Sequence, residues 1–213
     1  MSKMFLDPNE PLYTCTAENC DGCGVSEELV CHFNIRQLLI FLSMALPVFL
    51  LAGFLIFRLN PYLLIPWILF ILSYFGLMEI RVLCSHCPHY AEPTLKSLQC
   101  WANYGSPKLW KYRPYPMSSL ERVVFYLGFI VIVSGPVVPA LLQKSYLLLG
   151  LYIVLIAVWK WALKVLYCSH CMNFACPFNT IDSELRKRFF DRNPAIGKAW
   201  EEYGQGHMTD RST

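Results

Sequence analysis

The sequence predicts an all-α integral membrane protein whose four transmembrane helices form two antiparallel hairpins. Of its 213 residues, 55% are apolar and only 15% are charged, against about 25% charged in an average soluble protein. Four uninterrupted apolar stretches explain this composition, and each is long enough to cross the hydrocarbon core as a helix. A Cys-Ser-His-Cys tetrapeptide follows the second and the fourth stretch. This recurrence predicts that one hairpin unit is repeated within the chain.

The predicted spans cover residues 36–57, 61–83, 120–142 and 145–167. Asn60 supplies a cap for the second span, with a proline at its first helical position. Ser118 and Glu121 have the spacing of a capping box that opens the third span. The connections at 58–60 and 143–144 are short, so each pair of spans is expected to form a tight hairpin. The resulting divisions are a Cys-rich N-terminal segment (1–33), hairpin 1 (34–83), a Cys- and aromatic-rich loop (84–119), hairpin 2 (120–167) and a Cys-rich tail (168–213).

The distribution of positive charge predicts which side of the membrane carries the cysteines. An even number of crossings places the N-terminal segment, the 84–119 loop and the tail on one face, together with all ten cysteines. Of the 18 Lys and Arg residues, only Arg58 and Lys144 lie at the opposite face. The positive-inside rule therefore makes the cysteine face, and both termini, cytoplasmic in a cell inner or plasma membrane. In a reducing cytoplasm, clustered cysteines indicate metal ligands or catalytic thiols rather than disulfides.

The first cysteine cluster lies before the first span. Cys15, Cys20 and Cys23 have the spacing of the leading ligands in plant-type [2Fe–2S] ferredoxins, and Cys31 follows eight residues later. Four thiolates in so short a segment also suit a zinc ion. The pattern therefore predicts a metal site but does not name the metal.

The second and third clusters contain the two Cys-Ser-His-Cys tetrapeptides. Cysteines followed directly by proline, at 87–88 and 176–177, are typical of bacterial ferredoxin motifs, which favours iron–sulfur clusters. Histidines in the loops suit mixed Cys and His zinc sites instead. His89 is the better histidine ligand, because His86 and His170 lie in two-residue spacers and are expected to bond the backbone. The predicted metal ligands are Cys15, Cys20, Cys23, Cys31, Cys84, Cys87, His89, Cys100, Cys168, Cys171 and Cys176.

Three functions remain open at this point. The leading hypothesis is an iron–sulfur electron-transfer protein or subunit that exchanges electrons with a membrane quinone or a partner redox protein. The alternative is a non-enzymatic accessory or assembly subunit of a membrane complex, with zinc stabilising its short loops. A third is a membrane enzyme that handles metal or transfers thiols, which would need an accessible cysteine of low pKa.

Composition also excludes some partners. A net charge of +3, without a basic patch interleaved with aromatic residues, argues against nucleic acid. The sequence has no glycine-rich nucleotide loop, which argues against ATP or nicotinamide binding. The expected partners are the lipid bilayer and a redox or membrane-complex subunit.

Overall fold

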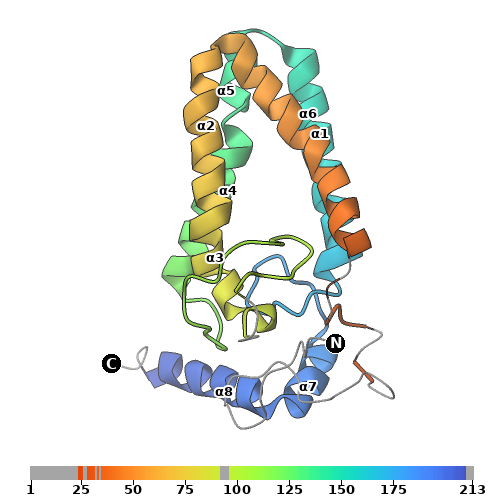
Figure 1. Cartoon of the computed structure of the whole chain (residues 1–213), viewed down its shortest axis with the longest axis vertical. Helices are drawn as coiled ribbons and strands as arrows, with labels where there is room; N and C mark the ends of the chain where they lie inside the picture. Colours follow the sequence, from red (N-terminus) through yellow and green to blue (C-terminus); the bar gives the residue numbers. More distant parts are fainter. Residues whose placement is uncertain (1–23, 26–27, 32, 34, 92–95, 210–213) are drawn as a thin grey trace.

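The computed structural model describes residues 24–25, 28–31, 33, 35–91 and 96–209. Within these residues the regular secondary structure is helical, apart from one isolated β-bridge between Ser97 and Pro107. Figure 1 shows a long helical bundle with irregular loops and two shorter helices at one end. The predicted N-terminal ligands Cys15, Cys20 and Cys23 lie outside the described residues.

The described residues contain four helical spans that are long and apolar enough to cross a membrane. The first is α1 (Ile35–Leu59). The second joins α2 (Pro61–Ser73), the π-helical turn η1 (Tyr74–Met78) and α3 (Glu79–Val82), and it runs on to His86. The third consists of α4 (Ser119–Ser134) and α5 (Val137–Leu142), and the fourth of α6 (Tyr146–Leu163) and the π-helical turn η4 (Lys164–Cys168). The all-helical membrane architecture expected from the sequence is therefore supported.

Local capping sets the helix boundaries where the sequence placed them. The Asn60 side chain accepts a hydrogen bond from the Tyr62 N–H at 2.9 Å, and Pro61 begins α2. The Ser118 hydroxyl accepts from the Glu121 N–H, and the Glu121 carboxylate accepts from the Ser118 N–H at 3.0 Å, which completes the capping box of α4. The third span is interrupted between α4 and α5, where Pro136 lacks the N–H that a continuous helix needs.

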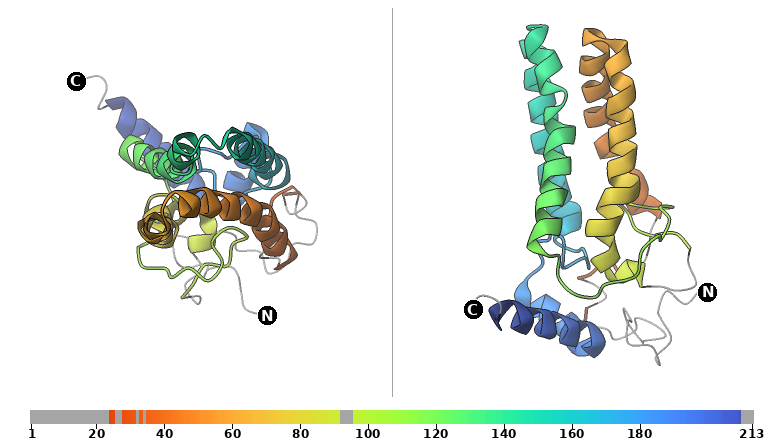
Figure 2. Two further views of the ribbon diagram at one scale, coloured as in Figure 1. Left: turned by 90° about the horizontal axis from the view of Figure 1, so that it is seen from above. Right: turned by 90° about the vertical axis from the view of Figure 1, so that its left-hand side faces the viewer.

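Helix α1 contacts α2, α5 and α6, whereas α4 contacts α2, α3 and α5. Figure 2 shows the four spans running side by side along the long axis. Small residues such as Ala52 and Ala140 let the backbones approach in the apolar interior. Much of the outer surface of the spans is apolar and exposed, as at Leu147, which suits contact with lipid.

The end of the bundle that carries the described cysteines is covered by α7 (Ser183–Arg192) and α8 (Pro194–Thr209), which lie across it in Figures 1 and 2. A buried cluster joins these helices to Cys87 in the first loop; it contains Val25, Leu29, Cys87, Met172, Phe174, Leu185, Phe189 and Ile196. The Tyr115 ring stacks on Tyr203 of α8 at 5.4 Å between centroids. The cysteine loops are therefore enclosed between the membrane spans and the tail helices.

Candidate functional site

The described cysteines reach the enclosed end of the bundle from two loops. Cys84 begins the short 3₁₀ turn η2 (Cys84–His86), and Cys87 precedes a second one, η3 (Pro88–Tyr90). Cys100 lies further along the same loop, Cys168 ends η4, and Cys171 and Cys176 occupy the segment before α7. Cys31 packs against the apolar cluster that contains Cys87. The cysteines of these two loops are all free thiols: Cys84, Cys87, Cys100, Cys168, Cys171 and Cys176.

Four of these thiols, Cys87, Cys100, Cys171 and Cys176, form a group that we call the thiol cluster. Burial raises the pKa of the Cys171 thiol, and the nearby sulfurs of Cys87 and Cys100 raise it further. Burial and the charge of Cys100 likewise raise the pKa of Cys87. Burial raises the pKa of Cys176 to about 12. The loops that follow the two hairpins therefore bring these thiols close enough for the charge on one sulfur to raise the pKa of another.

Each sulfur of the thiol cluster accepts backbone N–H hydrogen bonds from residues two or three positions later. The donors are the N–H groups of His89 for Cys87, Ala102 and Asn103 for Cys100, Asn173 for Cys171, and Phe178 and Asn179 for Cys176. These bonds favour the ionised sulfur and lower its pKa against the effect of burial. Hydrogen bonds of this kind surround the sulfur ligands of iron–sulfur clusters and tune their potentials.

The sulfur positions themselves do not form a metal coordination shell. No group of three or more His, Cys, Asp or Glu side chains among the described residues is placed so that it could hold a metal ion. The spacing of the sulfurs therefore lacks the closeness that coordination requires. Their chemistry, thiols with amide donors nearby, is nevertheless of a kind that binds metal.

Cys84 and Cys168 lie at the edges of the thiol cluster. Asn103 donates through its side-chain amide both to the Cys84 sulfur and to the Glu79 carboxylate, at 3.2 Å each. Glu79 is buried, with 9% of its surface exposed. Cys168 lies near Cys176 and raises its pKa. Sequence reasoning identified both cysteines but not Asn103, because no local pattern links it to Glu79.

The two spacer histidines bond the backbone, as expected from their position between paired cysteines. Nδ1 of His86 lies 2.6 Å from the Tyr115 carbonyl oxygen, and Nδ1 of His170 lies 2.9 Å from that of Glu28. A carbonyl only accepts, so Nδ1 carries the proton in both rings. His89 is half-buried in η3, and its N–H donates to the Cys87 sulfur. The structure does not place its side chain with the thiols as a ligand group.

An ion-pair network fastens the first cysteine loop to the start of α4. The Arg113 guanidinium donates to the Glu121 carboxylate, to the Arg81 carbonyl and to the Ser85 hydroxyl. Arg81 also pairs with Glu121, at 3.3 Å. These partners are separated by up to 40 residues, so the network has no local sequence signal. It fixes the chain on both sides of Cys84 and Cys87.

Comparison with protein-family models, with curated proteins and with solved structures finds no match for this chain.

Proposed function

We propose that this chain is a membrane-embedded metal–thiolate protein that transfers electrons through an iron–sulfur centre. The observation that carries the proposal is the thiol cluster, in which one buried and three partly buried cysteines from the loops of both hairpins each accept backbone N–H bonds at sulfur. Cysteines that served only as small apolar residues would not require donors directed at every sulfur. A bound cation would offset the repulsion between the thiolates and bring them closer together.

The ligands of this centre would be the four residues of the thiol cluster, Cys87, Cys100, Cys171 and Cys176. Cys84 and Cys168 would lie beside it. When bound, an iron–sulfur cluster supplies one-electron chemistry. The residues of this chain set its environment: amide donors lie at the sulfurs, and side chains of α7 and α8 pack in the apolar cluster that contains Cys87. The Cys15–Cys31 segment would provide a further site. The positive-inside rule supports a cytoplasmic position for all of these cysteines, next to a soluble or membrane-bound redox partner.

A zinc-stabilised accessory subunit is the second candidate. It is favoured by the loop structure, since the described chain between Leu83 and Ser118 contains only two 3₁₀ turns and one isolated bridge. Such a loop gains little from secondary structure, and metal binding could supply its folding energy. In this case removal of zinc would unfold the loops without loss of any redox signal.

Anaerobic purification, followed by visible absorption and electron paramagnetic resonance, separates the two candidates. The proposal predicts a coloured protein with a reducible paramagnetic centre, together with iron and acid-labile sulfide. A colourless protein that contains only zinc would support the accessory role. A protein that binds no metal under these conditions would refute both.

A further inference from the structure

The backbone of the first cysteine loop is paired with itself over residues 96–108, a segment that we call the bridge loop. The β-bridge between Ser97 and Pro107 joins its two arms. The Leu98 N–H also donates to the Ser106 carbonyl at 2.8 Å, and the Leu98 side chain is only 1% exposed. Because this pairing satisfies several backbone polar groups within the loop, the loop can lie at a depth where water is scarce.

The turn of the bridge loop contacts spans on both sides of the bundle. The Trp101 ring lies 5.2 Å from the Phe41 ring of α1 and 4.4 Å from the Tyr167 ring at the end of the fourth span, measured between centroids. On the other side, the Asn103 amide donates to the Glu79 carboxyl group of α3 at 3.2 Å. Figure 1 shows this part of the chain running from α3 towards the lower end of α1, where the helices are spread apart. The bridge loop therefore lies between the spans at the cysteine end.

The contact with Phe41 indicates how deep the turn of the loop lies in the membrane. Arg58 marks the polar boundary at the other end of α1, 17 residues after Phe41. A helix rises about 1.5 Å per residue, so about 26 Å of helix separates the two residues, and tilt would shorten this distance across the membrane. The hydrocarbon core is about 30 Å thick. Phe41 therefore lies just inside the core on the cysteine side, and the Trp101 ring lies against it.

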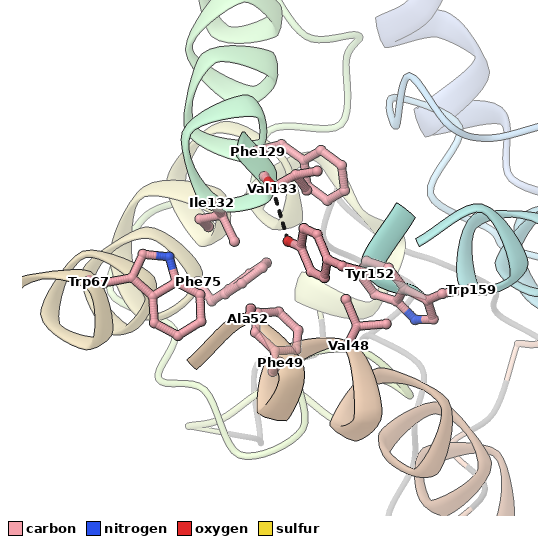
Figure 3. Close-up of a pocket in the computed structure, with 10 residues that line it drawn as sticks. All are labelled: Val48, Phe49, Ala52, Trp67, Phe75, Phe129, Ile132, Val133, Tyr152 and Trp159. Atoms are coloured by element: carbon pink, nitrogen blue, oxygen red, sulfur yellow. Dashed lines mark hydrogen bonds between the residues drawn. The ribbon is translucent and has the colours of Figure 1, made fainter. Parts of the chain in front are cut away.

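Farther into the membrane, side chains fill the interior of the bundle. Figure 3 shows aromatic rings from several spans, including Phe49, Phe75 and Phe129, packed around a small space. The Tyr152 hydroxyl there donates to the Val133 carbonyl at 3.0 Å. The space that remains has room for about one water molecule. The bridge loop therefore has no large internal cavity to occupy, and its exposed side chains face the surroundings of the bundle.

The exposed side chains of the bridge loop and of the residues just after it are apolar, aromatic or cationic. Tyr104 at the turn is 51% exposed, and Leu109 is 59% exposed. Lys96 and Lys111 are also exposed. The sequence from 96 to 120 contains no Asp or Glu. Such a surface complements the interface of an anionic membrane, where aromatic rings lie at the headgroups and lysines attract phosphate.

Both lysines lie near the end of the membrane spans. The Arg113 N–H donates to the carbonyl of Ser85, at the end of the second span, at 2.8 Å, and Lys111 is two residues away from this bond. Lys96 precedes Trp101 by five residues, so at most about 18 Å of extended chain separates them. A lysine side chain can extend from such a position to the headgroup phosphates.

We propose that the bridge loop is embedded in the leaflet on the cysteine side, and that Lys96 and Lys111 bind the phosphates of anionic phospholipids there. Trp101 and Tyr104 place the turn among the acyl chains and headgroups, and the lysines hold its base at the phosphate layer. The loop is thereby part of the membrane domain and not a cytoplasmic segment. This inference depends on the span architecture and the loop contacts, and it does not require a bound metal.

Fluorescence quenching by brominated lipids tests the depth of the loop. The full chain is placed in phosphatidylcholine nanodiscs with bromine in the upper or the lower half of the acyl chains, and the emission of Trp101 is the difference between the native chain and Trp101→Phe. We expect about twofold quenching, stronger with the upper bromines, because the ring lies near the boundary. Trp161 is 66% exposed on α6 and should be quenched, whereas Trp200 packs in the tail clusters and should not. A Trp101 signal as unquenched as that of Trp200 would overturn the inference.

Electron paramagnetic resonance of spin-labelled lipids tests the phosphate contacts. The native chain should retain phosphatidylglycerol at its surface in preference to phosphatidylcholine, and the double variant Lys96→Gln with Lys111→Gln should lower this preference by about twofold or more. The control is Lys198→Gln on α8, where the lysine pairs with Glu202 at 3.7 Å, and it should leave the preference unchanged. Thermal unfolding checks that each variant is folded. An unchanged preference in the double variant, or an equal loss in the control, would refute the binding of anionic lipid by this loop.

Discussion

Replacing Gly128 by Ala should disrupt the contact between the second and third spans. A Cβ atom at this position would lie 2.0 Å from Cε2 and 2.3 Å from Cδ2 of Tyr74, far inside van der Waals contact. The Tyr74 ring is 3% exposed, and its hydroxyl donates to the Phe125 carbonyl at 2.6 Å. The ring therefore cannot turn away from Gly128 without losing that hydrogen bond.

The expected magnitude follows from these two effects. Overpacking of a well-packed interior costs about 1–3 kcal/mol, and loss of the Tyr74 hydrogen bond adds about 1 kcal/mol. The matched control is Gly150→Ala, because nothing lies within 4 Å of a Cβ built on Gly150 in α6. That change should leave the free energy of unfolding unchanged or raise it by up to about 1 kcal/mol, since Ala favours a helix more than Gly.

Reversible unfolding of the detergent-solubilised protein by dodecyl sulfate, followed by circular dichroism, measures both changes. In a Tyr74→Ala background, Gly128→Ala should cost little more, because the atoms that it would strike are gone. Equal effects of the two glycine substitutions would refute the contact, as would full additivity of Gly128→Ala with Tyr74→Ala.

The remaining predictions concern the cysteine loops. Cys87→Ser and Cys171→Ser should each remove most of the bound metal, measured by elemental analysis per folded chain, and retention of native metal content by both would exclude a shared centre. In metal-free protein, burial raises the pKa of Cys176 from 9.0 to about 12, so this thiol stays protonated in the fold while it ionises in the unfolded chain. The free energy of unfolding should therefore be fully retained below pH 9 and fall as the pH rises to about 12; a profile identical to that of Cys176→Ser would contradict this. Asn103→Ala should lower the free energy of unfolding by about 1–3 kcal/mol, because the buried Glu79 carboxyl group and the Cys84 sulfur lose this amide donor. An unchanged free energy of unfolding in urea or dodecyl sulfate titration would contradict these contacts.

The elements that could be predicted from sequence are those fixed by neighbouring residues. The spans follow from apolar length, and the beginnings of α2 and α4 follow from caps only two or three residues away, at Asn60 and Ser118. The backbone bonds of His86 and His170 follow from the short spacers that hold them. These features depend on local geometry, which a single sequence expresses directly.

The rest depends on contacts between distant residues. Nothing near Tyr74 in the sequence indicates that it packs on Gly128, and nothing near Arg113 indicates that it pairs with Glu121 in the structure. The cysteine patterns predicted metal ligands in each loop but left open which of them share a site, whereas the structure brings Cys87 and Cys171 from different hairpins into one neighbourhood. That association requires the hairpins to pack against each other, and spacing within a motif does not encode it.

X-ray absorption at the edge of the bound metal tests the central claim most directly, because it reports the atoms that surround the metal. If sulfurs from both loops bind one centre, the first shell of the native protein consists of sulfur at about 2.3 Å. The spectrum of Cys87→Ser should then lose sulfur neighbours or vanish. A native first shell of nitrogen and oxygen, or one unaltered by this substitution, would contradict the account.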